Sequence, residues 1–124
     1  MASYPTSAAM RGQARKGLRL REKHKRGGLD TREAGRQGIG SGVARARDIA
    51  SGRDLPIETW RRVAAFFERT SGYRDAAGSP SRGYYGDDTN PSAGYIAHLL
   101  WGGYDAGRKR AAAVIAKHEA ARDD

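Results

Sequence analysis

Apolar side chains recur at helical spacing in several parts of the chain, and the clearest stripe lies in residues 56–71, PIETWRRVAAFFERTS. Intervals of three and four residues place these side chains on one face of an α-helix. Pro56 fits the first helical position, where its missing N–H group is no loss, and Gly72 follows the end. The stripe predicted to be buried consists of Ile57, Trp60, Val63, Ala64 and Phe67.

Two more helices are predicted in the C-terminal part of the chain. The first covers residues 91–101, with Asn90-Pro91 as its cap. The second covers residues 105–122, after a chain break at Gly102-Gly103. The side chains expected to face the core are Ile96, Leu99, Leu100, Trp101, Ala111, Val114, Ile115 and His118.

Two further helices are predicted in the N-terminal half. Residues 43–51 form a short helix that ends at Gly52. Its inward side chains are Val43, Ala46 and Ile49 or Ala50. Residues 6–26 form a longer helix, for which Thr6 or Ser7 is the N-cap. This longer helix is amphipathic in charge and only weakly amphipathic in apolarity.

The remaining segments carry turn residues in place of a helical period. Residues 27–42 hold six glycines and are interpreted as a flexible loop, and residues 72–89 form a second loop rich in tyrosine. No segment alternates apolar and polar residues with the period of a β-strand. The sequence therefore predicts an all-α fold: a single compact domain of about five helices over residues 1–124, with residues 43–122 as the helical core.

Composition narrows the chemistry open to this chain. Its 124 residues include no cysteine, which excludes disulfides, thiolate metal sites and a cysteine nucleophile. No stretch approaches the ~20 apolar residues that span a bilayer, so no membrane partner is expected. His24, His98 and His118 are far apart and share no metal-ligand spacing, and Asp87-Asp88 is interpreted as an acidic turn tip. No cofactor, no bound metal and no enzymatic activity are predicted.

The net charge of +9 is concentrated near the N-terminus. Residues 1–50 hold 12 Lys and Arg against 4 Asp and Glu, whereas residues 51–100 hold 6 of each. Of the 23 cations in the chain 18 are arginine, whose planar guanidinium matches phosphate best. A one-sided positive field indicates a polyanion or an acidic protein surface as the partner.

The predicted helix over residues 6–26 carries most of this charge. Residues 11–26 hold eight cations and one carboxylate, Glu22. The alternative to ligand binding is a charged face that only water contacts, but such a face usually alternates charges at i,i+4, and here like charges repel. Gly12 and Gly17 each cost the helix about 1 kcal/mol relative to alanine, so it needs docking for stability. The predicted nucleic-acid contacts are Arg11, Arg15, Lys16, Arg19, Lys23, Lys25 and Arg26.

Residues 38–48, GIGSGVARARD, combine alternate glycines with two arginines at a predicted helix start. A dinucleotide fingerprint requires a glycine at the position of Val43 and a preceding strand, and a P-loop requires Gly-Lys-Ser/Thr, which this chain lacks. The stretch is therefore predicted to be a hinge. In a second interpretation, N–H groups at the helix start act with Arg45 and Arg47 to hold one phosphate of a polymer.

Two other modes of nucleic-acid binding are less favoured. Residues 43–51 and 56–71 have the lengths of a helix-turn-helix, but the turn between them is longer than the usual three to four residues, so an ordinary helical hairpin is preferred. Tyr73, Tyr84 and Tyr85 have the chemistry to stack on single-stranded bases. A lid of tyrosines over a small core explains the same residues and is preferred.

Two segments carry a more specific pattern, GVARARDIASGRDLPIETWRRVAAFFERT and NPSAGYIAHLLWGGYDAGR. Their motifs are G-V-A-R-A-R-D, T-x-x-R-V-x-x-F-F, P-S-A-G-Y-I-A and W-G-G. Together they resemble a small domain of tailed-phage genomes that often lies near, or is fused to, head-assembly and head-maturation proteins. Residues 30–39 are an insertion relative to that pattern. The resemblance implies a phage origin and, since the family has no assigned activity, no mechanism.

The function predicted from the sequence is nucleic-acid binding, mainly through phosphates and with low sequence specificity. DNA is the favoured form of nucleic acid. The alternatives are a virion or head-assembly component that docks on an acidic capsid surface, and an inhibitor that binds a host protein. The expected location is the host cell cytoplasm or the virion.

Overall fold

The computed structural model describes residues 2–25, 42–71 and 85–122, and this part of the chain is mostly helical. The predicted all-α fold is confirmed. Arg26, Tyr73, Tyr84 and residues 27–41 of the glycine-rich segment lie outside the described residues. The elements in chain order are β1 (Ser3–Tyr4), α1 (Ala8–His24), α3 (Gly42–Ala50), β2 (Leu55–Pro56), α4 (Ile57–Arg69), α6 (Ala93–Leu100), the π-helical turn η1 (Gly103–Gly107) and α7 (Arg108–Arg122).

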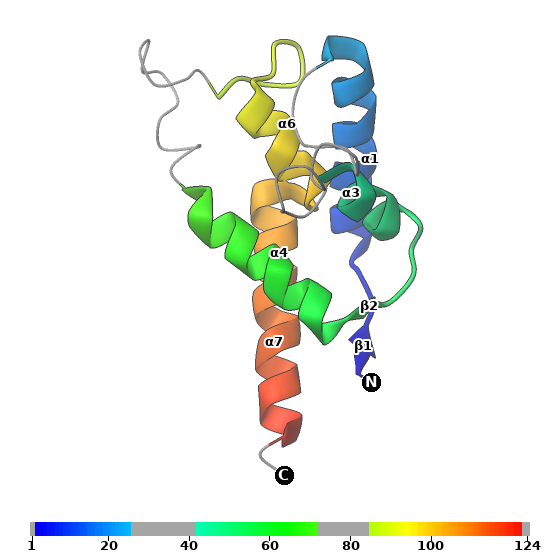
Figure 1. The fold of residues 1–124 in the computed structure, drawn as a ribbon, viewed down its shortest axis with the longest axis vertical. Helices are drawn as coiled ribbons and strands as arrows, with labels where there is room; N and C mark the ends of the chain where they lie inside the picture. Colours follow the sequence, from blue (N-terminus) through cyan, green and yellow to red (C-terminus); the bar gives the residue numbers. More distant parts are fainter. Residues whose placement is uncertain (1, 26–41, 72–84, 123–124) are drawn as a thin grey trace, which may run out of the picture.

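Figure 1 shows how the helices are arranged around the C-terminal half of the chain. The elements α6, η1 and α7 follow one another in one long column. Helix α4 crosses α7, whereas α1 packs against α6, and α3 contacts both α1 and α6. The apolar side chains between these helices form the core, which consists of Met10, Ala14, Ala46, Ile49, Leu55, Ile57, Trp60, Val63, Phe67, Ile96, Leu100, Trp101, Ala111 and Val114.

Aromatic rings from α4 and from Trp101, the residue that follows α6, pack against one another at this core. The six side chains predicted as the main core, Trp60, Val63, Phe67, Ile96, Leu100 and Trp101, are all buried. Phe66 stacks on Trp101, with ring centroids 4.5 Å apart and planes 8° from parallel. This stacking joins α4 to the junction between α6 and α7.

The junction between α6 and α7 depends on two glycines with left-handed backbone angles. Gly102 has φ +103° and Gly103 has φ +90°, a conformation that L side chains rarely adopt. A Cβ on Gly102 would lie 2.5 Å from Met10 Cγ, so the chain also passes too close to α1 for a side chain. The predicted break is therefore present, but η1 follows it before α7 begins, in place of a helix that starts at Asp105.

Two predicted helix caps are wrong. Ser92, not Asn90-Pro91, is the N-cap of α6, because its Oγ accepts a hydrogen bond of 3.0 Å from the Tyr95 N–H group. Pro56 precedes α4 as its N-cap and is not its first helical residue. At α1 the expected cap Ser7 accepts from the Met10 N–H at 3.1 Å, and the helix is shorter at both ends than residues 6–26.

A short strand pair corrects the expectation of a fold without strands. Strand β1 pairs antiparallel with β2, with Ser3 opposite Pro56 and Tyr4 opposite Leu55. Two residues per strand are too few to show an alternating pattern in the sequence. The pair fixes the chain ahead of α1 to the start of α4.

Candidate nucleic-acid interface

Helix α1 turns one side to the core and the opposite side to solvent. Met10, Ala14 and Gly17 are buried. At about 100° per residue, Arg15, Arg19 and Lys23 lie on the other side of the helix, within an arc of roughly 80°. All three are exposed, and we call them the basic face.

The basic face is held in place by the packing behind it. At Gly17 the backbones of α1 and α6 come so close that an added Cβ would lie 2.8 Å from Leu100 N. The cap at Ser7 fixes the start of the helix, and Lys25 ends it with φ 55°, a left-handed conformation. The helix therefore presents its three cations about 6 Å apart along a fixed axis, because four residues rise about 6 Å.

Two other predicted contacts are engaged at the edges of α1. Arg11 Nη1 donates to the Thr6 carbonyl oxygen at 2.7 Å and to Thr6 Oγ1 at 3.0 Å, which ties the helix to the segment before it. Lys25 lies 3.3 Å from Glu22 in an exposed ion pair. Both cations have an intramolecular role in the folded protein.

Arg15 belongs to the basic face and also joins two helices. Its Nη2 donates to the Ala50 carbonyl oxygen at 3.1 Å, at the C-terminal end of α3. A cation at the carbonyl end of a helix interacts favourably with the helix dipole. The side chains of Arg19 and Lys23 make no hydrogen bond or ion pair with any of the described residues, so their charged groups are available to a ligand.

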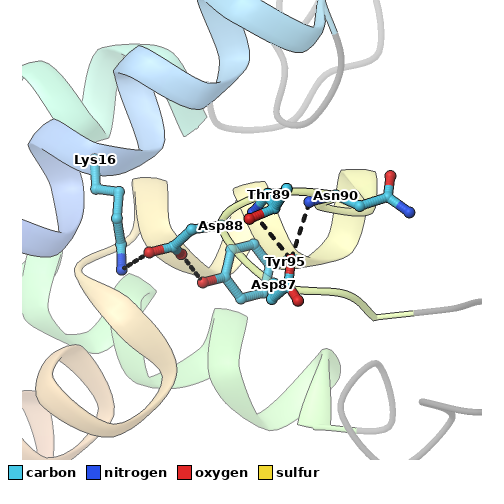
Figure 2. A network of polar contacts seen from close by, with 6 residues as sticks. All are labelled: Lys16, Asp87, Asp88, Thr89, Asn90 and Tyr95. Carbon is cyan, nitrogen blue, oxygen red and sulfur yellow. Dashed lines mark hydrogen bonds and ion pairs between the residues drawn. The ribbon is translucent and has the colours of Figure 1, made fainter.

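Lys16 is paired with an acid from another part of the chain. Its Nζ lies 3.1 Å from Asp88 Oδ2, and the Tyr95 hydroxyl donates to Asp88 Oδ1 (Figure 2). The hydrogen bond from Tyr95, followed by that from Lys16, lowers the pKa of Asp88 below its ordinary value. The sequence indicated an acidic turn tip here but not its partner, because Lys16 and Asp88 are 72 residues apart.

The two arginines predicted on α3 have different environments. Arg45 is largely buried, with 14% of its side chain exposed, and lies 3.4 Å from Asp48 and over the Trp101 ring. Desolvation by burial lowers the pKa of Arg45. The Arg47 side chain is exposed and makes no hydrogen bond or ion pair with the described residues. The structure therefore does not bring Arg45 and Arg47 together as one phosphate clamp.

His98, His118 and Tyr85 make structural contacts within the described part of the chain. His98 is buried, with Nδ1 2.7 Å from the Tyr85 hydroxyl and Nε2 3.0 Å from Thr70 Oγ1. His118 Nδ1 lies 2.9 Å from the Tyr4 hydroxyl. Tyr85 is half-buried against His98, as a lid over the core would be. Among the described residues no group of three or more His, Cys, Asp or Glu side chains is placed to hold a metal ion.

The chain was compared with protein-family models, with curated proteins and with solved structures, and none of them matches. The resemblance to a tailed-phage domain therefore stays a prediction. Within the residues that the structure describes, no helix has the length and apolar character needed to cross a membrane.

Proposed function

We propose that this protein binds nucleic acid, mainly through its phosphates, with the basic face of α1. The observation that carries the proposal is the line of Arg15, Arg19 and Lys23 on the solvent side of a firmly docked helix. Like charges at i,i+4 destabilise an isolated helix, and a row of phosphates removes that repulsion. Exposed Arg47 on α3 is a further candidate contact.

Several features support a binding protein in preference to an enzyme. The buried side chains of His98 and Thr70 bond to each other in the core. The basic face consists of two arginines and a lysine, whose contacts to phosphates position a polymer. It includes no Asn or Gln, so it offers no mixed set of side chains to read base edges. We therefore infer low sequence specificity, with DNA as the favoured ligand.

The location follows from the resemblance and is part of the proposal. A phage origin favours the host cell cytoplasm or the virion. An acidic capsid or host protein surface is the alternative partner and would contact the same cations. Binding to nucleic acid in a salt titration separates the two, because each phosphate contact on a duplex releases counterions.

The test replaces Arg19 and Lys23 by glutamine, since neither side chain makes a hydrogen bond or ion pair with the described residues. Each lost phosphate contact lowers the slope of log K against log salt by about 0.9, so the R19Q/K23Q variant should bind duplex DNA more weakly and lose nearly two units of slope. The measurement is fluorescence anisotropy at several salt concentrations.

A control variant removes the same charge from another surface. Arg62 on α4 and Lys117 on α7 are both exposed, and R62Q/K117Q also lowers the net charge by two. This control should change affinity less than twofold, because its cations lie outside the proposed interface. Equal losses of affinity in both variants would show that net charge alone causes the effect and would contradict the proposal.

A further inference from the structure

The pair formed by Lys16 and Asp88 lies beside the basic face. Lys16 follows Arg15 directly on α1, and its charged group ends 3.1 Å from Asp88 Oδ2. The other oxygen of this carboxylate accepts a hydrogen bond from the Tyr95 hydroxyl of α6 (Figure 2). An acid from a distant part of the chain is therefore fixed against a cation that was predicted to contact the ligand.

The turn that carries Asp88 is ordered by its own bonds. Asp87 Oδ1 accepts from the Thr89 N–H at 2.9 Å and from the Asn90 N–H at 3.0 Å (Figure 2). The Ser92 N–H donates to the Tyr85 carbonyl oxygen at 3.0 Å, which closes the turn at its base. These bonds hold the backbone of Asp88, so the carboxylate is presented to α1 from a fixed position.

Asp88 also acts on the basic face itself. Arg19 is close enough to contribute, after Tyr95 and Lys16, to the lowered pKa of Asp88. The interaction is mutual, so the carboxylate reduces the positive potential at Arg19 as well as at Lys16. A phosphate that approaches this edge of α1 therefore meets an ion pair in place of a free cation.

We propose that Asp88 competes with the polyanion for Lys16 and thereby weakens binding along the edge of the basic face that lies next to α6. The proposal rests on the proposed function and identifies a residue that lowers the affinity for the polyanion. The pair is partly exposed, with 27% of the Lys16 side chain and 56% of the Asp88 side chain accessible. Exposed ion pairs are weak and screened by salt, so a phosphate is able to displace the carboxylate.

The test compares D88N with D87N. Both variants raise the net charge by one at adjacent positions, but Asp87 bonds to backbone N–H groups and not to Lys16. D88N should bind duplex DNA about two- to fivefold more tightly at low salt, the range that an exposed ion pair supports. Its slope of log K against log salt should steepen by up to about 0.9, one added phosphate contact.

Two further variants connect this effect to the lysine. In a K16Q background, the gain in affinity of D88N over D87N should shrink to the smaller part that comes from Arg19, because no lysine is left to release. Y95F removes the hydroxyl that holds Asp88 and should shift affinity in the same direction as D88N by a smaller factor. Circular dichroism of each variant verifies an unchanged helix content.

The outcomes separate this proposal from the proposed function. Equal gains for D88N and D87N, or a gain for D88N that is undiminished in K16Q, would overturn the competition and leave nucleic-acid binding intact. Wild-type protein that binds no duplex, or that binds it equally well as R19Q/K23Q, would overturn the proposed function and this proposal with it.

Discussion

Tyr95 and Asp88 set each other's protonation at the scale of single residues. Burial, followed by the hydrogen bond to Asp88, raises the pKa of Tyr95 above its ordinary value, so the hydroxyl keeps its proton. The hydroxyl donates a hydrogen bond to Asp88, and this hydrogen bond is the largest cause of the lowered pKa of the Asp88 carboxyl. The folded state thus gains stability from Asp88 above the ordinary carboxyl pKa and loses it as the pH falls through the lower folded value.

Substitution of either partner should therefore raise the pKa of Asp88. Y95F and K16Q should each raise it, because the hydrogen bonds from Tyr95 and from Lys16 both lower this pKa in the folded protein. The measurement is an NMR titration of the Asp88 side-chain carboxyl in the wild type and both variants. An unchanged pKa of Asp88 in either variant would show that the substituted side chain does not hold the carboxylate in solution.

Single residues also show what the sequence was able to predict about the candidate site. The helical period alone places Arg15, Arg19 and Lys23 on the solvent side of α1, and they are exposed. The period contains no information on partners that are distant in sequence. The Asp88 carboxylate at Lys16 and the ring of Trp101 beside Arg45 depend on tertiary packing, so only the structure reveals them.

At the scale of elements, apolar periodicity was enough to predict that the helices exist. Local signals were too ambiguous to predict where some of them begin or end. Asn90 and Ser92 are both good N-cap residues on either side of Pro91. The choice of Ser92 accompanies the burial of Pro91 and its bridge to Gly86, which are tertiary contacts. The pairing of β1 with β2 is likewise a contact between distant segments that no local pattern encodes.

The packing of α1 on α6 gives a prediction at this scale. Both Gly12 and Gly17 were expected to weaken α1, but their surroundings differ. A Cβ at Gly17 would lie 2.8 Å from Leu100 N and 2.9 Å from Leu99 Cβ, whereas nothing lies within 4 Å of a Cβ at Gly12. Gly17→Ala should lower the free energy of unfolding by about 1–3 kcal/mol, since the helices must separate.

The matched variant Gly12→Ala should raise the free energy of unfolding by about 0.5–1 kcal/mol, through helix propensity alone. Urea denaturation of both variants measures the two changes under the same conditions. A stabilising effect of alanine at both positions would show that α1 and α6 do not approach as closely as the structure indicates.

At the scale of the whole molecule, the N-terminal segment ties the helices together. The Trp60 side chain of α4 donates from Nε1 to the Tyr4 carbonyl oxygen at 3.3 Å. Arg110 of α7 donates from Nε and Nη2 to the Pro5 carbonyl oxygen, at 3.0 and 2.8 Å, and its guanidinium lies over the Trp60 ring. The residues that lead into α1 are therefore bound to both α4 and α7.

These hydrogen bonds from Trp60 and Arg110 should contribute to stability and not to nucleic-acid binding. Arg110→Gln removes two charge-assisted hydrogen bonds to one carbonyl oxygen and should lower the free energy of unfolding by about 1–2 kcal/mol. Lys109→Gln removes the same charge at an exposed neighbouring position and should stay within about 0.5 kcal/mol of the wild type. Thermal denaturation gives the stabilities, and salt-titrated binding of duplex DNA gives the affinities of the folded variants.

Both variants should show the wild-type salt slope, because neither residue belongs to the basic face. A reduced slope in Arg110→Gln, with no loss of stability, would instead assign Arg110 to the interface and would extend the ligand from α1 to α7.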